Sequence, residues 1–134
     1  MERIEIEADR KAFGFQVTTF PGKVSDAFDA LMHKIPHGGQ RSYYGISWME
    51  GDTIVYYAAA EQKSVDEPKL YGAREFTIQR GTYLVEKISD WMPKVGLIKG
   101  IFETMMKDPQ LDLTSPAIEW YRSDDEMWCM MRLK

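Results

Sequence analysis

The feature that most constrains the fold of this chain is a weak internal repeat with a spacing of 72 residues. When the second half is laid over the first, the aligned positions are Ile4 with Phe76, Ile6 with Ile78, Pro21 with Pro93, and Ile46-Ser47-Trp48 with Ile118-Glu119-Trp120. Chance produces a few such matches, but the expected order of strands and helices repeats as well. We therefore expect two copies of one strand-helix-strand-strand unit, at residues 1–61 and 76–134.

In the first copy the spacing of apolar residues predicts four strand segments and one helix. Residues 4–6 and 12–20 are β-rich, and residues 43–48 and 54–60 read as two strands around the turn Glu50-Gly51-Asp52. Between them one helical stripe of apolar residues is formed by Val24, Ala27, Phe28, Leu31 and Ile35. Pro36 predicts the end of this helix.

The second copy follows a polar connector, residues 62–75, within one domain of residues 1–134. Strands are expected at 76–78 and 83–88, a helix from near Trp91 to before Pro109, and a last hairpin at 116–122 and 126–133. The apolar stripe of this helix is wide: Val95, Leu97, Ile98, Ile101, Phe102 and Met105. That width predicts deeper burial than for the first helix.

Two such units can merge their hairpins into one curved antiparallel sheet with both helices on a single face, an α+β fold. The opposite, concave face would then be free to hold a ligand. Within this scheme Glu119 departs from the repeat, because its counterpart in the first copy is Ser47. Alternation along a strand places Glu119 and Tyr121 on one face. A charge present in one copy only is a candidate for function.

Composition narrows the classes of function. The formal net charge of −4 and the lack of a Lys and Arg cluster argue against a nucleic-acid surface. No apolar run is long enough to span a membrane, the N-terminus lacks a signal peptide, and the single Cys129 fits a reducing compartment, so we expect a cytoplasmic protein. His33 and His37 make a poor zinc site, and no glycine loop suits a phosphate, so we expect neither metal nor cofactor.

Arg80-Gly81-Thr82-Tyr83, the helix after them and Ile118-Glu119-Trp120-Tyr121 resemble the GyrI-like small-molecule-binding family. That family includes the effector-binding domains of multidrug-responsive transcription activators. The resemblance covers the whole chain and implies a duplicated β-α-β-β fold with an aromatic-lined pocket between the halves. It implies that Glu119 and Tyr121 contact the ligand, with Tyr83 as a further candidate. The chain has no room for a helix-turn-helix and resembles a stand-alone member.

Other aromatic residues offer pocket walls. Because odd-numbered residues of a strand share a face with one another, we extend the parity of Glu119 and favour Tyr43 and Tyr57, with Trp91 as a further candidate. Packing in the core is the alternative for each. Such rings suit planar aromatic or cationic ligands. For Glu119 itself, the alternatives are exposure to water or an ion pair with Arg122 or Arg132.

The leading hypothesis is a stand-alone domain that binds a small hydrophobic or cationic aromatic compound through Glu119. Some stand-alone members of the family are hydrolases that open strained cyclopropane rings, which gives an alternative: a metal-independent hydrolase. In it Glu119 activates water and Tyr121 or Tyr57 assists the leaving group. A third hypothesis is an inhibitor that binds a protein partner through its outer surface. A monomer and a dimer are both compatible with the sequence.

Overall fold

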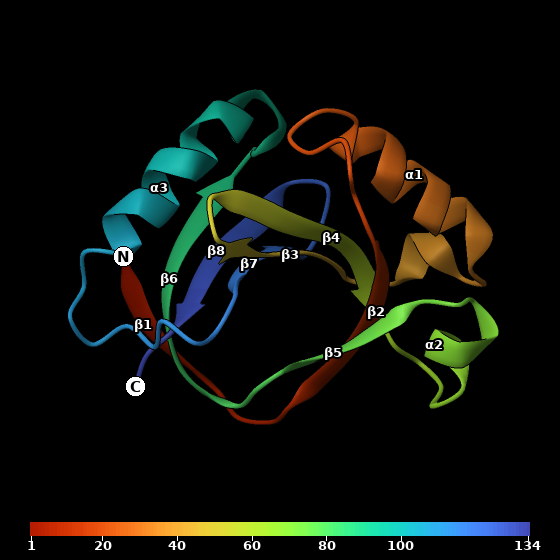
Figure 1. The fold of residues 1–134 in the computed structure, drawn as a ribbon, viewed down its shortest axis with the longest axis horizontal. Coiled ribbons are helices and arrows are strands. Elements are labelled where there is room, and N and C mark those ends of the chain that lie inside the picture. The colour runs from red at the N-terminus through yellow and green to blue at the C-terminus, as the bar shows by residue number, and fades with distance from the viewer.

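The two copies of the repeat build one sheet between them. In the computed structural model, which describes residues 1–134, all eight strands are antiparallel and follow the order β1-β6-β8-β7-β3-β4-β2-β5. The sheet curls into a half-barrel (Figure 1). The elements are β1 (Glu2–Ile6), β2 (Arg10–Gln16), α1 (Val24–Lys34), η1 (Gly38–Gln40), β3 (Tyr43–Glu50), β4 (Thr53–Glu61), α2 (Glu67–Leu70), β5 (Arg74–Ile78), β6 (Gly81–Ser89), η2 (Met92–Leu97), α3 (Ile98–Met105), β7 (Ala117–Tyr121) and β8 (Glu126–Arg132).

The predicted repeat and α+β fold are confirmed, with one refinement. Each copy begins with two strands rather than one, because the chain leaves the ladder between β1 and β2 and again between β5 and β6. The first strands are exchanged: β1 pairs with β6 of the other copy, and β5 pairs with β2. β3 and β7 pair at the centre of the sheet and join the two copies. Each half of the sheet therefore ends in an edge strand that comes from the other copy.

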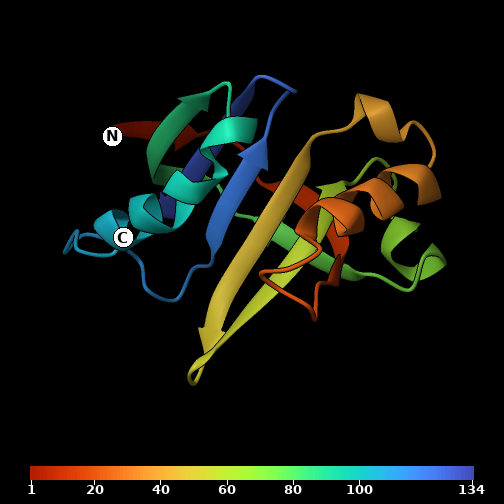
Figure 2. The ribbon, with the colours of Figure 1, turned by 90° about the horizontal axis from the view of Figure 1, so that it is seen from above.

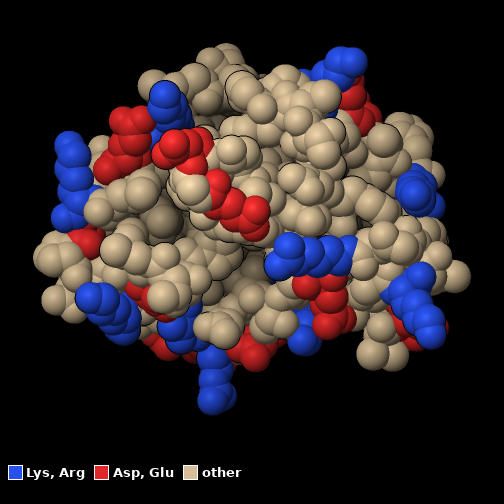
Figure 3. Space-filling view, in the orientation of Figure 1, with Lys and Arg blue, Asp and Glu red and all other residues tan.

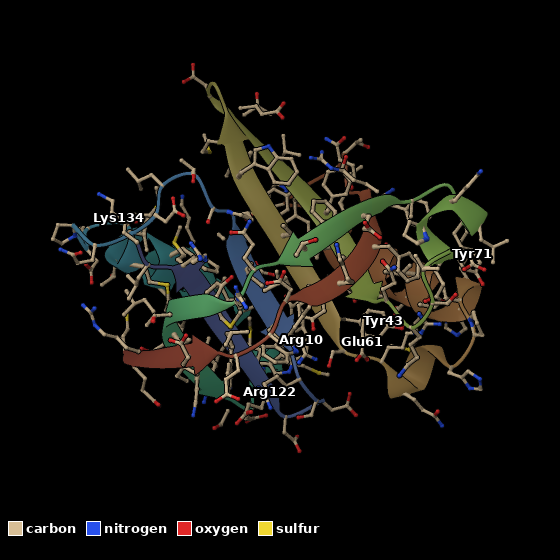
Figure 4. All side chains as sticks on the ribbon, turned by 90° about the horizontal axis from the view of Figure 1, so that it is seen from below. Arg10, Tyr43, Glu61, Tyr71, Arg122 and Lys134 are labelled. Atoms are coloured by element: carbon tan, nitrogen blue, oxygen red, sulfur yellow. The ribbon has the colours of Figure 1, made fainter.

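The concave face of the sheet is filled by the largest hydrophobic cluster. Its twelve buried residues come from all eight strands and include Tyr44, Ile46, Ile118, Trp120 and Met130. At one end of this face the guanidinium groups of Arg10 and Arg122 lie 4.6 and 4.4 Å from the centre of the Trp120 ring (Figure 4). The expectation that this face is free to hold a ligand is wrong for most of its length, because the inward-curling strands bring their own side chains together there.

Both long helical segments cover the outer, convex face (Figure 1). The predicted stripe of α1 packs on the sheet, with Leu31 and Ile35 buried and Phe28 beside them. The second helical segment is not the more deeply buried one: Val95 and Leu97 are 53% and 57% exposed, and Met105 is the one buried residue of α3. The segment begins as the 3-10 helix η2, which contains Pro93 and Gly96. A 3-10 helix repeats every three residues, so side chains rotate away from an α-helical stripe.

The connector between the copies is anchored by a buried ion pair. The guanidinium of Arg41, just before β3, donates to both carboxylate oxygens of Glu67 in α2, at 3.0 and 2.7 Å. Backbone N–H groups of Lys63 and Ser64 donate to the same carboxylate. Burial alone would raise the pKa of Glu67, but these hydrogen bonds and the charge of Arg41 outweigh it and hold the pKa below its ordinary value. The polar connector thus has a fixed structure.

Surface charge is dispersed. On the face seen in Figure 3, basic and acidic side chains are interspersed among other residues, at the centre as well as around the edge, and neither sign forms a continuous patch. The longest helix, α1, has 11 residues, and no helix in the structure combines the length and the apolar character of a membrane span.

Candidate functional site

The candidate site lies where the two copies meet, on the face that carries the helices. The β3–β7 register places Glu119 opposite Gly45, and Ala117 and Tyr121, two residues on either side, pack against the cluster that includes α3. Figure 2 shows β7 and β3 passing between α1 and α3. Glu119 is therefore on the convex face, between the helices, and not on the concave face where a ligand was expected.

Two tyrosine hydroxyls hold the carboxylate of Glu119. Tyr56 on β4 and Tyr121 on β7 both donate to Oε1, at 2.8 and 2.7 Å, while Oε2 has no hydrogen-bond partner. None of the ion pairs includes Glu119. Arg122 pairs with Glu126 and Arg132 with Asp112 instead. The carboxylate therefore has no cationic partner and one oxygen available to a ligand.

Aromatic rings from both copies surround this carboxylate. Phe20 stacks on Tyr56 with ring centres 4.6 Å apart. Phe28 of α1 and Trp91, at the start of η2, meet Tyr121 edge-on at 5.3 and 4.9 Å. Glu119, Tyr121, Phe20, Phe28 and Trp91 are each partly exposed. We call these residues, with buried Tyr56, the Glu119 site.

The low polarity of the Glu119 site perturbs its titrating groups. Burial raises the pKa of Glu119, and the hydrogen bonds from Tyr121 and Tyr56 only partly oppose this. Burial and then the charge of Glu119 raise the pKa of both tyrosines, so both stay protonated donors. Burial also raises the pKa of Cys129, which pairs with Glu119 across the strands, to about 12. Cys129 is therefore a buried thiol rather than a nucleophile.

Gly45 makes room for this arrangement. A Cβ atom at this position would overlap the hydroxyl of Tyr56 and lie 2.5 Å from Oε1 of Glu119. A glycine in the middle of a strand often marks a close approach of this kind. The sequence signal for the site was thus present in Gly45 as well as in Glu119.

The parity argument for Tyr57 is wrong. In the structure Glu50 pairs with Thr53, so the turn between β3 and β4 has two residues, Gly51 and Asp52, and not three. An odd residue of β3 therefore faces the same way as an even residue of β4. Tyr56 joins the Glu119 site, whereas Tyr57 lies on the other face, where it stacks on Trp48 with ring centres 5.6 Å apart.

The structure places the remaining predicted residues as follows. Tyr121 and Trp91 lie in the Glu119 site. Tyr43 lies on the same face of the sheet as Glu119, but it is buried against Phe28, and its hydroxyl donates to the backbone oxygen of Gly38 at 2.5 Å. Tyr83 lies on the concave face and donates to the backbone oxygen of Gln79 at 2.7 Å. Sequence reasoning favoured Tyr57 over Tyr56 and did not propose Phe20 or Phe28 for the site.

The Glu119 site offers hydrogen bonding and charge rather than metal ligands. No group of three or more His, Cys, Asp or Glu side chains is arranged so that it could hold a metal ion. The free oxygen Oε2 can accept a hydrogen bond or attract a positive charge, and the rings can stack on flat surfaces. A partly buried carboxylate with a raised pKa can also act as a general base.

No protein-family model and no curated protein matches the chain, but solved structures do. An integron cassette protein from the mobile metagenome of Vibrio cholerae superposes with a TM-score of 0.72 at 16% identity, covering 99% of this chain and 95% of that one. A protein solved bound to tetraphenylphosphonium gives 0.66 at 15% identity, covering 99% and 93%. A Staphylococcus aureus MU50 protein described as a transcription regulation protein gives 0.58 at 14%, covering 98% and 97%. These likenesses establish a shared fold.

Proposed function

We propose that this chain is a small-molecule-binding protein of the GyrI-like, effector-binding type, which holds hydrophobic and cationic aromatic compounds at the Glu119 site. The observation that carries the proposal is a partly buried carboxylate with no Lys or Arg beside it. A buried carboxylate without a cationic partner costs free energy. A ligand cation that pairs with the carboxylate removes part of this cost, and the gain favours binding.

The surrounding rings select the kind of cation. Phe20, Phe28, Trp91 and Tyr121 present ring faces and edges and no charge. Each aromatic contact contributes about 0.5–1.5 kcal/mol, and rings also attract cations. A delocalised aromatic cation satisfies both the rings and the carboxylate. The structural neighbour that binds tetraphenylphosphonium is in accord with this choice.

The test compares a cation with a neutral compound of similar shape. Tetraphenylphosphonium and triphenylphosphine oxide are titrated by calorimetry into the wild type, Glu119→Gln and Glu75→Gln. Glu75 is an exposed carboxylate on β5, so its substitution removes the same charge from a remote position. We expect Glu119→Gln to weaken phosphonium binding at least tenfold, about 1.4 kcal/mol, with little effect on the neutral compound. Equal loss in Glu75→Gln, or none in Glu119→Gln, overturns the proposal.

A hydrolase is the second candidate, and the contacts of Glu119 with two phenol groups favour it. In such a reaction Glu119 accepts a proton from water through Oε2, and Tyr121, whose hydroxyl lies 2.7 Å from Oε1, is the phenol proposed to assist the leaving group. Tyr57 is too remote for the role that the sequence suggested. Product analysis of every bound electrophile by mass spectrometry separates the candidates: a strained ring opened by the wild type and intact with Glu119→Gln shows an enzyme.

A further inference from the structure

A cavity opens on the concave face, on the opposite side of the sheet from Glu119. Its volume is about 180 Å³, and its apolar wall is formed by Ile46, Phe76, Ile78, Tyr83 and Ile118. Ile118 and Glu119 are adjacent in β7, so their side chains point to opposite faces. A cavity of about 150 Å³ holds a benzene molecule. The concave-face cavity is therefore large enough for a compact hydrocarbon group of about six carbon atoms.

The mouth of this cavity is polar, and one of its two charged groups is already saturated. Asp112 accepts hydrogen bonds from the backbone N–H and the hydroxyl of Thr114, at 3.0 and 2.6 Å, and from the hydroxyl of Ser115 at 3.0 Å. Arg132 Nη1 lies 3.5 Å from Oδ2. A carboxylate accepts about four hydrogen bonds. Asp112 is thus filled and has no acceptor to offer a ligand.

Arg132, in contrast, keeps unused donors. Its Nε and Nη2 donate to the backbone oxygen of Arg80 at 3.3 and 3.0 Å, and Nη1 faces Asp112. A guanidinium has five N–H groups, so two remain. Gly81 admits this guanidinium, since a Cβ there would lie 3.0 Å from Nη2, and its φ of +142° favours glycine. The backbone is therefore shaped to hold Arg132 at the mouth of the cavity.

We propose that this cavity is a second ligand site, which binds a small carboxylate with an apolar body of five or six carbon atoms. The carboxylate accepts the free N–H groups of Arg132, and the body lies against Ile46, Ile78 and Ile118. Charge-assisted hydrogen bonds are roughly twice as strong as neutral ones, so a carboxylate is preferred over an amide. An amine finds no free acceptor at Asp112 and gains no hydrogen bond there, so we expect it to bind more weakly than the carboxylate.

The experiment follows isoleucine methyl signals by NMR while 4-methylpentanoate, 4-methylpentanamide or 4-methylpentylamine is added to the wild type. We expect the carboxylate to shift the methyl signals of Ile46, Ile78 and Ile118 and to bind at least tenfold more tightly than the amide, and the amine to bind more weakly than the carboxylate. Equal binding of carboxylate and amide, or no shift of these methyls at 10 mM carboxylate, overturns the proposal.

Two variants locate the site. Arg132→Met should weaken carboxylate binding at least tenfold, whereas Glu119→Gln should leave it unchanged. Loss of binding in Glu119→Gln would assign the carboxylate to the Glu119 site and overturn the second site. If Arg132→Met unfolds, as a collapsed methyl spectrum would show, the comparison of carboxylate with amide on the wild type still decides. Because the two sites use different residues, failure here leaves the proposal for Glu119 standing.

Discussion

At the scale of single residues, the account depends on a carboxylate that the fold keeps without a cation. Two phenol donors hold Glu119, and no basic residue pairs with it. Arg122 and Arg132 lie on the other face of the sheet, where each pairs with a different carboxylate. A carboxylate held in this way lowers stability when it ionises, because desolvation disfavours the charged form. Residues that reduce stability in this way are typical of binding and catalytic sites.

The first prediction concerns the stability of Glu119→Gln as a function of pH. The pKa of Glu119 is higher in the folded than in the unfolded protein, where it is near 4.5. The protonated carboxyl group therefore contributes its whole stabilising effect below pH 4.5, and this effect is lost as the pH rises through the pKa of the folded protein. Each unit of elevation corresponds to about 1.4 kcal/mol. We expect Glu119→Gln to melt above the wild type at pH 8 and the difference to vanish near pH 4. Calorimetric melting at both pH values measures it, and a wild type that is the more stable at pH 8 contradicts the explanation.

The second prediction concerns Gly45→Ala. Its new Cβ overlaps the hydroxyl of Tyr56, whose ring is buried and stacked on Phe20 and so has little room to move. Overpacking of this kind costs about 1–3 kcal/mol. Urea denaturation should show a loss in that range, and binding of tetraphenylphosphonium should weaken. Gly39→Ala, where a Cβ meets nothing within 4 Å, is the control, and an equal effect of the two substitutions would refute the role of Gly45.

The sequence could predict the charged centre of the site but not its full composition. Glu119 departs from the repeat and Tyr121 shares its strand, so both follow from local alternation. Tyr56 depended on whether a turn had two or three residues, because one residue reverses the faces of the next strand. Phe20 and Phe28 reach the site through the packing of a loop and a helix, which no local period reveals.

At the level of helices and strands, the periodicity of the sequence predicted which elements exist and in what order, but it did not distinguish an α-helix from a 3-10 helix. The stripe from Val24 to Ile35 forms α1 as expected, since its apolar side chains all reach the sheet. The second stripe, from Val95 to Met105, forms α3 only from Ile98 onward; Val95 and Leu97 lie in the 3-10 helix η2 and are exposed. The polar connector looked featureless because its order comes from a distant partner, Arg41.

The third prediction tests that anchor. Removing one member of a buried ion pair leaves the other charge unpaired and costs about 3–5 kcal/mol. We expect this loss for Arg41→Ala, a smaller loss for the double variant with Glu67→Ala, and almost none for Lys99→Ala, which breaks an exposed pair in α3. Urea denaturation of the wild type, Arg41→Ala, Glu67→Ala and the double variant gives the double-mutant cycle, and Lys99→Ala is the control. A loss below about 1 kcal/mol for Arg41→Ala would show that the pair does not hold the connector.

At the scale of the whole molecule, the exchange of first strands makes the copies interdependent. β1 completes the edge beside β6, and β5 completes the edge beside β2. The central β3–β7 pair then brings Gly45 of one copy against Glu119 of the other. The Glu119 site therefore exists only when both copies are present.

The fourth prediction follows from that exchange. Residues 1–72 and 73–134, produced separately, should each lack the strand that covers their outer edge and remain unfolded by circular dichroism. Mixed in equal amounts, they should recover the strand signal and bind tetraphenylphosphonium. A stably folded single fragment would show that the copies are independent units and that the exchange is not required.

If the carboxylate of Glu119 meets the bound cation, the pKa of that carboxyl group must differ between the free and the bound protein. ¹³C NMR of the glutamate carboxyl signals, titrated with and without tetraphenylphosphonium, provides both values. The account predicts a pKa above the ordinary value in the free protein and a fall on binding, because a nearby cation favours the charged form. A pKa that is unchanged by the bound cation would place the ligand elsewhere and contradict the account.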